Sequence, residues 1–395
     1  MGSIREIVGR WVHPVLLVVL VLILTYGAIF LQTAVRGDGS WNRQMQGVAL
    51  GIVLMLIVWL FDYRRLQNWL MPLYILNVLL LISPRIPFIG HSVAGATRWI
   101  NVPGIGTVQP SEPAKIITIL LLAAIISRYG GQINDWKTFW KVVGLSLIPF
   151  FAVMTQPDLG TGLVFIIVMV GMLFLGGAKM RFMATLIVGG IALIAVVFAV
   201  NTYTWDESRR GGEGDYLLIR TYQLNRLSVF LDQGQSDPRG AGYDLNQSKI
   251  AIGSGGMTGK GLGEGTQSQL DFISERSTDY IFSVLGEELG FLGAILLIGL
   301  YMALLLVALS IAAQSSDLFG TLICGGIIAM WAFQILQNIG MTMGLMPITG
   351  IPLPFMSYGL SAIVTNIIAC GLLFAVWSRR PYQARTRGGA DDIVV

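Results

Sequence analysis

The sequence predicts an all-α polytopic membrane protein with ten transmembrane helices and a large extracytoplasmic loop between helices 7 and 8. Of the 395 residues, 54% are hydrophobic and only 12% are charged, which is about half the charged fraction of a soluble domain. Apolar runs of about twenty residues recur along the chain, each long enough to cross a membrane as a helix. Lys and Arg are concentrated in alternate connections between these runs, as in membrane proteins of fixed orientation.

A spanning helix needs about twenty mostly apolar residues, because each residue rises about 1.5 Å across roughly 30 Å of hydrocarbon. The first run is too long for the core of a signal peptide and lacks a small-residue cleavage site, so we expect it to be retained. The predicted spans are 14–33, 45–62, 67–83, 110–128, 138–155, 160–176, 181–201, 280–312, 318–345 and 358–378.

An even number of spans puts both termini on one side of the membrane. Long loops translocate largely regardless of charge, so loop 202–279 is left out of the count. We expect both termini in the cytoplasm of a multi-pass protein of the cytoplasmic (inner) membrane, with the loop outside. Residues 1–379 would form one transmembrane domain, and 380–395 a polar cytoplasmic tail. The termini side holds thirteen basic residues, Arg5, Arg10, Arg64, Arg65, Arg128, Lys137, Lys141, Lys179, Arg181, Arg379, Arg380, Arg385 and Arg387, and the other side holds five, Arg36, Arg43, Arg85, Arg98 and Lys115.

Histidine and cysteine are scarce. The chain contains only His13 and His91, and both Cys324 and Cys370 lie inside apolar runs. No disulfide framework, zinc spacing or His-based triad fits this usage. No basic cluster has the interleaved aromatic residues typical of nucleic-acid binding. Chemistry by this chain must therefore use carboxylates, hydroxyls, amides, Lys and Arg.

A cluster of ionisable residues lies at the start of the eighth apolar run. Charge at a membrane boundary is costly, so such a cluster is a functional hypothesis by default. Asp279 is the candidate for its central group. The alternative is a first-turn acid, which the helix dipole would stabilise with a lowered pKa, whereas burial would raise that pKa. The cluster consists of Asp271, Glu275, Arg276, Asp279, Glu287 and Glu288.

The outer segment before the fourth span also carries polar residues. Arg98 beside Trp99 suits an anionic head group, since a guanidinium binds phosphate bidentately. Ser111 is a predicted helix N-cap. Glu112 and Lys115 are three residues apart and share a helix face. The segment is either a polar pocket at the outer mouth or a helix start with a local ion pair.

Two further outer segments contain polar or glycine-rich motifs. Asp158 lies in a very short turn, where a turn carboxylate or N-cap is the simpler alternative. The long loop is rich in glycine but is not a phosphate-binding P-loop, because Ser254 replaces a required Gly and Gly261 follows Lys260 in place of Ser or Thr. These glycines would shape a groove for a lipid-linked or extended substrate, or else form a flexible loop.

Prolines and glycines interrupt the chain between the ninth and tenth spans, at 346–357. Irregular backbone at membrane depth is tolerated only where it is buried in protein or lines a cavity. We therefore expect a broken or re-entrant segment that forms a cavity wall.

Over nearly the whole chain these segments resemble the SEDS family (shape, elongation, division and sporulation) of bacterial peptidoglycan polymerases. Residues 265–270 are more similar to the RodA-like elongation members than to the FtsW-like division members. The matching motifs are Gly-Ala-x-Arg-Trp-Ile at 95–100, Gln-Pro-Ser-Glu-x-x-Lys at 109–115, Gln-Pro-Asp-Leu-Gly at 156–160, Gln-Ser-Lys at 247–249 through Gly256, Thr-Asp at 278–279 followed by Glu-Glu-Leu-Gly at 287–290, and Gly-Ile-Pro-Leu-Pro-Phe at 350–355 through Gly359.

The resemblance implies a ten-helix fold that polymerises lipid II outside the cytoplasmic membrane during elongation, with Asp279 as the essential acidic residue. It implies a class B penicillin-binding protein as the crosslinking partner within the elongation machinery. The chain departs from the family pattern at Ser277, where His is usual, at Leu360, where a second Gly is usual, and at Gly286, where Ala is common. A mechanism that needs a histidine at 277 therefore does not apply.

The predicted activity is that of an inverting peptidoglycan glycosyltransferase without an organic cofactor. Asp279 would act as general base on the 4-hydroxyl of the acceptor sugar, or as the ligand of a divalent cation such as Mg²⁺ or Mn²⁺; both roles stay open. A lipid II flippase is the main alternative. A flippase needs access from both sides of the membrane, whereas the polar groups of this chain are predicted on the outer face alone. A non-catalytic scaffold is the third possibility. The predicted substrate-binding residues are Arg98, Gln109, Glu112, Lys115, Asp158, Arg226, Gln247, Ser248, Lys249, Glu275, Arg276, Thr278, Ser357 and Tyr358.

Overall fold

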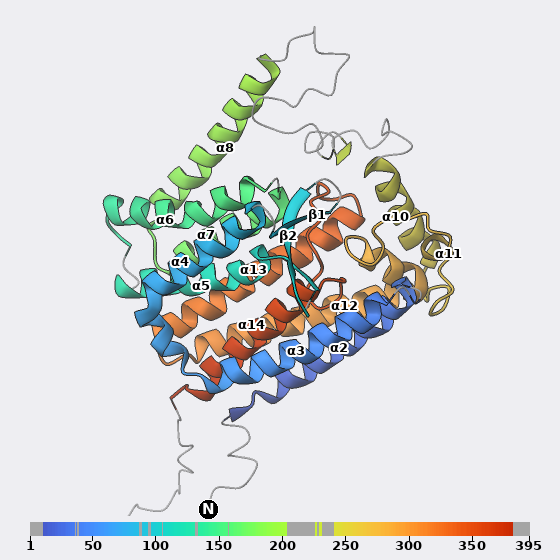
Figure 1. The fold of residues 1–395 in the computed structure, drawn as a ribbon, viewed down its shortest axis with the longest axis horizontal. Coiled ribbons are helices and arrows are strands. Elements are labelled where there is room, and N and C mark those ends of the chain that lie inside the picture. Colours follow the sequence, from blue (N-terminus) through green and yellow to red (C-terminus); the bar gives the residue numbers. More distant parts are fainter. Residues whose placement is uncertain are drawn as a thin grey trace, which may run out of the picture.

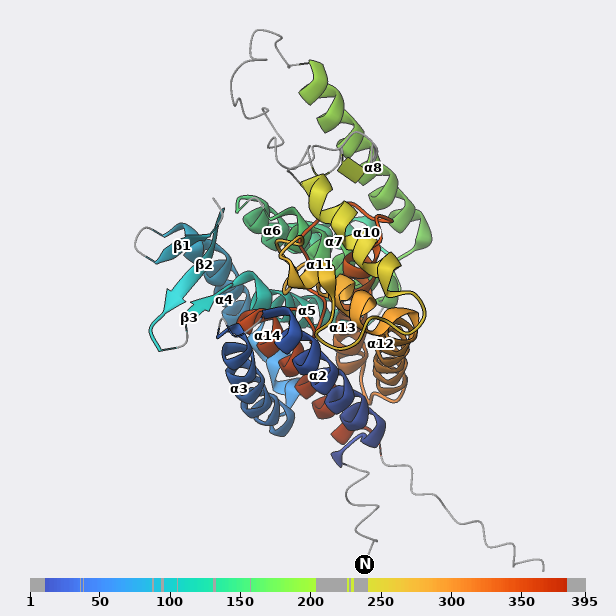
Figure 2. The same ribbon diagram turned by 90° about the vertical axis from the view of Figure 1, so that its right-hand side faces the viewer.

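The computed structural model is a bundle of long helices with a small sheet on one side (Figures 1 and 2). It describes residues 11–35, 37, 39–86, 89–93, 96–104, 106–130, 133–156, 158–203, 226, 229–230 and 241–381. The helices are α2 (Pro14–Val35), α3 (Ser40–Leu60), α4 (Leu70–Ile82), α5 (Ser111–Arg128), α6 (Trp136–Met154), α7 (Leu159–Leu175), α8 (Met180–Tyr203), α10 (Ala241–Gly255), α11 (Thr266–Gln269), α12 (Ile281–Ala313), α13 (Leu318–Thr342) and α14 (Leu360–Ser378), with 3-10 helices η1 (Tyr63–Trp69) and η2 (Ser83–Arg85).

Each predicted span overlaps one of these helices. Within the described residues, eight helical segments are long and apolar enough to cross a membrane, and α7 is a shorter apolar helix. The prediction of a mostly helical, multi-pass membrane protein is confirmed, while the count of ten spans stays a prediction. Much of the predicted loop 202–279 (204–225, 227–228 and 231–240), Gly95 of the Arg-Trp motif, and the tail from 382 onward lie outside the described residues.

Aspartate side chains set the starts of several helices. Asp135, Asp158 and Asp317 accept hydrogen bonds from the backbone N–H groups three residues onward, at 2.8, 3.1 and 2.6 Å. Each such cap stabilises a helix by about 0.5–2 kcal/mol. The cap predicted at Ser111 is wrong: Pro110 occupies the cap position of α5 and no side chain caps the helix.

The core is centred on α13 and α14, which together pack against α3, α5, α7, α10 and α12. In the most apolar stretch of α14, 78% of residues are buried, against 11% for α8. The indole of the fully buried Trp331 donates a hydrogen bond of 2.7 Å to Asn366 and so links the two central helices. By contrast, α8 extends away from the bundle in both views (Figures 1 and 2) and leaves its apolar side chains uncovered.

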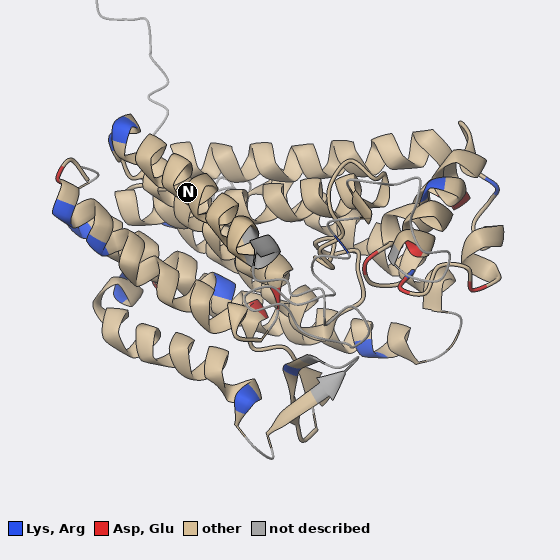
Figure 3. Cartoon of the chain, turned by 90° about the horizontal axis from the view of Figure 1, so that it is seen from above, with Lys and Arg blue, Asp and Glu red and all other residues tan. Residues whose placement is uncertain are grey.

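The two ends of the described chain lie together. The rings of His13, just before α2, and Trp377, at the end of α14, are 4.4 Å apart. At the same end Arg64 forms a 3.0 Å ion pair with Asp317. We call this the termini end, and the opposite end the site end. Figure 3 shows Lys and Arg at the left-hand ends of the helices and also in the middle and at the right, whereas most Asp and Glu lie toward the middle and right.

A three-stranded antiparallel sheet, β1 (Gly90–Val93), β2 (Ala96–Val102) and β3 (Gly106–Val108), lies in the connection before α5. The all-α prediction missed it. The central strand pairs Trp99 with His91 and Ile100 with Val108, so aromatic and β-branched residues, which favour strands, meet across it.

The connection between α13 and α14 is irregular and buried, as its prolines and glycines predicted. Ile348, Leu353 and Met356 are all at most 5% exposed. The hydroxyl of Tyr301 in α12 donates a 2.6 Å hydrogen bond to the carbonyl of Pro354, satisfying a backbone group that helix geometry would otherwise pair. We call residues 343–359 the re-entrant segment.

Helix α12 is kinked at Gly290, which sequence reasoning treated as part of one continuous span. Its φ is 62° and its ψ is −156°, a backbone region open almost only to glycine. A Cβ at this position would stand 2.5 Å from the amide nitrogen of Gly259 and 2.8 Å from the carbonyl oxygen of Gly256. The glycine-rich loop after α10 therefore packs directly on the backbone of α12.

Candidate active site

Asp279 lies in a tight turn directly before α12. The amide groups of Asp279 and Tyr280 both donate to the carbonyl of Glu275, at 3.1 and 3.0 Å. The hydroxyl of Thr278 donates to the Glu275 carboxylate at 2.8 Å. Since Tyr280 is the cap residue of α12, the alternative of a first-turn acid is wrong. The turn, not the helix, fixes the partly buried carboxylate of Asp279.

Asn338 of α13 ties this turn to the re-entrant segment. Its side chain is fully buried. The amide nitrogen donates to the carbonyl oxygens of Asp279 at 2.9 Å and Ile351 at 2.8 Å. A single buried amide thus sets the distance between two segments that are remote in sequence, which is the kind of packed support that holds a reactive group in place.

Gly350 brings the re-entrant backbone against the carboxylate. Its φ is 71°, and a Cβ added there would stand 3.1 Å from Oδ2 of Asp279 and 3.5 Å from a guanidinium nitrogen of Arg226. The three residues therefore converge on one small volume. A glycine at this point lets the backbone approach the acidic group closely.

Ser357 and Tyr358 brace the turn from its other side. The Ser357 hydroxyl donates to the carbonyl of Thr278 at 2.6 Å and accepts from the amide of Leu353 at 2.8 Å. The amide of Tyr358 donates to the carbonyl of Ser277 at 2.8 Å. Ser357 and Tyr358, both predicted to bind substrate, therefore contact the backbone of the residues just before Asp279 and support the turn.

Asp158 is the centre of a second polar group at the site end. Besides capping α7, its carboxylate accepts from the hydroxyl of Thr161 at 2.9 Å and from the Gln109 amide at 3.2 Å. Arg98 of β2 lies 3.7 Å from it and also donates to the carbonyl of Gln156 at 3.2 Å. These bonds fasten the small sheet and the start of α5 to the bundle beside the acidic turn.

The charges of the two groups act on Asp279. The pKa of Asp279 is raised to about 6, first by burial and second by the negative charge of Glu275. The positive charges of Arg226 and Arg98 oppose this rise, while Asp158 adds a smaller one. Five predicted residues thus share one electrostatic environment. A carboxylate with a pKa close to neutral is suited to accept and release protons.

Glu112 and Lys115 form an ion pair, as their spacing predicted. The pair is 2.8 Å long, and the two side chains are 3% and 2% exposed. The second carboxylate oxygen of Glu112 and the hydroxyl of Ser111 are buried without a partner among the described residues. Burying two charges in one helix is costly unless their geometry is good, and a buried polar atom without a partner adds to this cost. The pair therefore stays a candidate for substrate contact. The structure shows no contact between this pair and Asp279.

The α10 residues have a different role in the structure. The buried hydroxyl of Ser248 lies 2.5 Å from that of Ser283 and donates to the carbonyl of Thr342 at 2.7 Å. Ser248 therefore braces α10 against α12 and α13. Its neighbours Gln247 and Lys249 are partly buried on the same helix.

Arg276 points toward α2 instead of toward Asp279. Its guanidinium donates to the carbonyl of Ala34 at 2.7 Å and forms an ion pair with the exposed carboxylate of Asp271. The sequence predicted that Arg276 binds the substrate, but in the structure its positive charge is partly compensated by the Ala34 carbonyl and the Asp271 carboxylate.

Glu287, another member of the acidic cluster, clamps the glycine-rich loop. Its fully buried carboxylate accepts from Lys260 at 2.7 Å and from the backbone amides of Gln267 and Ser268 at 2.9 and 3.2 Å. Lys260 therefore pairs with a carboxylate of α12 in this fold. Its neighbour Glu288 accepts from Thr33 of α2 at 3.0 Å.

Sequence reasoning missed residues that hold the site from within apolar helices. Gln44 of α3 donates to the carbonyl of Ser357 and accepts from the amide of Gly359, both at 3.1 Å. Both side chains are buried. A polar residue within a membrane-length apolar run was the available signal for Asn338, whereas Gln44 lies among other polar residues at the start of α3 and did not stand out. The position of Gly350 had no comparable signal.

A divalent cation is compatible with the site only if the substrate supplies ligands. Among the described residues no group of three or more His, Cys, Asp or Glu could hold a metal ion. Mg²⁺, however, is often bound by one or two carboxylates together with substrate phosphates. Asp279 and Glu275 are the pair that fits this arrangement.

Comparisons with known proteins extend over almost the whole chain. The model of the cell cycle protein family of FtsW, RodA and SpoVE matches residues 10–381. Peptidoglycan glycosyltransferase MrdB of Escherichia coli (strain K12) is 36% identical over 378 residues, covering 94% of this chain and 95% of its own. Peptidoglycan glycosyltransferase RodA of Treponema pallidum is 33% identical, covering 92% and 97%.

Solved structures agree with this relationship. The Rod shape determining protein RodA of Thermus thermophilus superposes with a TM-score of 0.66 at 26% identity, covering 92% of this chain and 96% of that one. A chain from a peptidoglycan synthase complex described as coordinating polymerization and crosslinking gives a TM-score of 0.74 at 28% identity, covering 92% and 96%. Because sequence and fold match over the same extent, the protein belongs to the cell cycle protein family of FtsW, RodA and SpoVE, the SEDS family that its motifs resemble.

Proposed function

We propose that this protein is a peptidoglycan glycosyltransferase that polymerises lipid II into glycan strands on the outer face of the cytoplasmic membrane, during cell elongation. Membership of the family and the names of its relatives support the activity. The observation that carries the proposal is the convergence of Asp279, Arg226 and Gly350 on one small volume at the site end. There a titratable carboxylate and a cation meet the backbone of the re-entrant segment.

The reaction forms one bond and breaks another. Oxygen 4 of the acceptor N-acetylglucosamine attacks the anomeric carbon of the donor from the side opposite the diphosphate, which inverts the configuration. The bond between that carbon and the diphosphate oxygen breaks, and undecaprenyl diphosphate leaves with its electron pair. Asp279 takes the hydroxyl proton, a step that typically contributes about 10²–10⁴-fold to the rate.

The leaving diphosphate needs positive charge. Arg226 and Arg98 are the basic residues whose charges already act on Asp279, and preorganised cations aimed at developing charge stabilise such transition states. When bound, a divalent cation would supply further charge neutralisation at the diphosphate. Asp279 and Glu275 are the residues that would hold it, so the base and cation-ligand roles of Asp279 are alternatives to be separated by experiment.

The proposed orientation puts the termini end in the cytoplasm and the site end outside. It is supported by the bias of Lys and Arg toward the termini end and by the shared location of His13 and Trp377. We infer a class B penicillin-binding protein as the crosslinking partner, because the similar chain in the synthase complex belongs to an assembly that coordinates polymerization and crosslinking.

The purified protein, with its penicillin-binding partner, is expected to convert lipid II into glycan polymer that gel electrophoresis resolves. The same protein in liposomes is expected to leave labelled lipid II in its original leaflet, since a flippase needs polar access from both faces. Translocation without polymer would overturn the proposal in favour of a transporter. Absence of both activities would favour a scaffold.

The polymerisation rate is expected to fall with decreasing pH through about 6, because the pKa of Asp279 is raised to about 6 and only the carboxylate accepts a proton. Removing a charge that raises this pKa should move the acid limb to lower pH, and removing one that lowers it should do the opposite. A pH–rate profile of Glu275→Gln should therefore shift down and that of Arg226→Gln should shift up. Shifts in the same direction would contradict the electrostatic account.

A further inference from the structure

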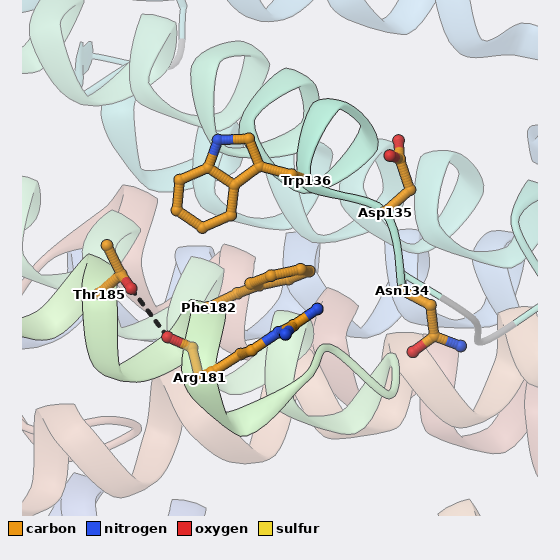
Figure 4. A pocket seen from close by; sticks show the side chains of 6 residues that line it. All are labelled: Asn134, Asp135, Trp136, Arg181, Phe182 and Thr185. Atoms are coloured by element: carbon orange, nitrogen blue, oxygen red, sulfur yellow. Dashed lines mark hydrogen bonds between the residues drawn. The ribbon is translucent and has the colours of Figure 1, made fainter.

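A surface groove lies at the termini end, between the starts of α6 and α8 (Figure 4). Its volume is ≈ 580 Å³. The groove is remote from the acidic turn, and the proposed reaction does not use it. The residues that line it are Asn134, Asp135, Trp136, Arg181, Phe182 and Thr185.

The groove presents a cation on an aromatic support. The guanidinium of Arg181 lies 5.0 Å from the ring centre of Phe182, and that ring lies 5.1 Å from the ring of Trp136. Figure 4 shows the Phe182 ring between the indole and the guanidinium. Stacking of this kind restricts a flexible side chain, so less conformational freedom is lost when its N–H groups bind an anion.

Within the part of the chain that the structure describes, Arg181 forms no ion pair with a carboxylate. Asp135, the carboxylate among the residues that line the groove, is engaged elsewhere: it accepts from the amide and the hydroxyl of Thr138 at 2.8 and 2.9 Å. Figure 4 shows this carboxylate pointing away from Arg181. The exposed Lys141 and Lys179 lie near the starts of the same two helices and add positive charge.

The surroundings of the groove are those of a membrane interface. Trp136 and Trp140 are 48% and 37% exposed, and tryptophan favours the head-group level of a bilayer. Directly beyond the groove, α8 exposes an apolar face, with Ile187, Val188 and Ile191 between 48% and 64% exposed. An occupant with an anionic head and long apolar chains matches both parts of this surface.

We propose that the groove between α6 and α8 is a binding site for an anionic phospholipid, whose phosphate contacts Arg181 and whose acyl chains lie along α8. Charge complementarity selects the head group, since basic pockets between transmembrane helices on the cytoplasmic side hold anionic lipid head groups. The exposed apolar face of α8 selects a lipid over a soluble phosphate. The site would also cover a helix that packs little against the bundle.

Native mass spectrometry of the full-length protein tests the proposal, with phosphatidylglycerol or phosphatidylcholine of equal chain length titrated into detergent micelles. The wild-type protein is expected to bind the first phosphatidylglycerol more tightly than phosphatidylcholine. Arg181→Gln is expected to weaken phosphatidylglycerol binding about tenfold, the loss of one charge-assisted contact. It should weaken phosphatidylcholine binding less, because the choline of that lipid already offsets the charge of its phosphate, so the preference for phosphatidylglycerol falls.

Arg65→Gln is the matched control, because Arg65 is an exposed arginine of η1 at the same end and lies outside the groove. It should keep the wild-type preference for phosphatidylglycerol. The proposal is overturned if Arg181→Gln keeps that preference, if Arg65→Gln loses it equally, or if inorganic phosphate displaces the lipid. Both variants should unfold at the wild-type temperature without added lipid, since neither side chain is buried.

Discussion

Replacing Asp279 with Asn is expected to lower the rate of glycan polymer formation by about 10²–10⁴-fold, because an amide cannot accept the proton of the acceptor hydroxyl. Asn has nearly the same shape, and the bonds that hold the turn are made by the backbone of Asp279, to Glu275 and Asn338. The loss should therefore fall on the reaction, with the unfolding temperature unchanged. Initial rates with labelled lipid II measure it.

Glu264→Gln is the matched control, since it makes the same acid-to-amide change at an exposed position of the glycine-rich loop. It should polymerise lipid II at the wild-type rate. A wild-type rate from Asp279→Asn would exclude a chemical role for this carboxylate. Titrating Mg²⁺ and Mn²⁺ separates the two roles left open: recovery of the variant at high cation concentration would assign Asp279 to cation binding, and no recovery would assign it to proton transfer.

Replacing Gly350 with Ala is expected to lower the polymerisation rate by about 10–100-fold, as displacement of a reactive group by about 1 Å can cost roughly that much. The added Cβ would stand 3.1 Å from Oδ2 of Asp279 and 3.5 Å from a guanidinium nitrogen of Arg226. Either the carboxylate moves or the space for the substrate shrinks. The left-handed backbone adds about 1–2 kcal/mol of strain for a residue with a Cβ.

Gly104→Ala separates these two effects. Gly104, in the turn between β2 and β3, has a φ of 83°, and nothing lies within 4 Å of an added Cβ. The control therefore carries the backbone strain without the contact. Rates and unfolding temperatures of both variants should be measured together. Equal losses of rate would show that the volume beside Asp279 is not used in the reaction.

The sequence predicted the helices well because their signal is local. A membrane span must be apolar over its whole length, so the predicted ranges overlap the helices throughout. The sheet at 90–108 was missed, because its strands are three to seven residues long and three short strands have no comparable signature. The kink at Gly290 was missed because it follows from a contact with the loop of Gly256 and Gly259, which no pattern within α12 encodes.

The charged residues of the candidate site could be predicted from the sequence, whereas the residues that hold them in place could not. Asp279, Asp158 and Arg98 were found because ionisable residues stand out at a membrane boundary. Glu112 and Lys115 were paired by helical spacing alone. The bonds of Asn338 to Asp279 and of Ser357 to Thr278 join residues 59 and 79 positions apart. Such contacts depend on how helices pack, and one sequence by itself does not contain that information.

The bond between Ser357 and Thr278 also has a consequence for biosynthesis. Ser357 is synthesised 79 residues after Thr278. At about 5–20 residues per second, the ribosome supplies it roughly 4–16 s later. Asn338 and Gly350 also follow Asp279 in the chain, so the acidic turn emerges before these three supports. We expect that chains stalled before α14 insert normally but make no polymer, which would keep an unfinished enzyme from acting on the cell wall precursor.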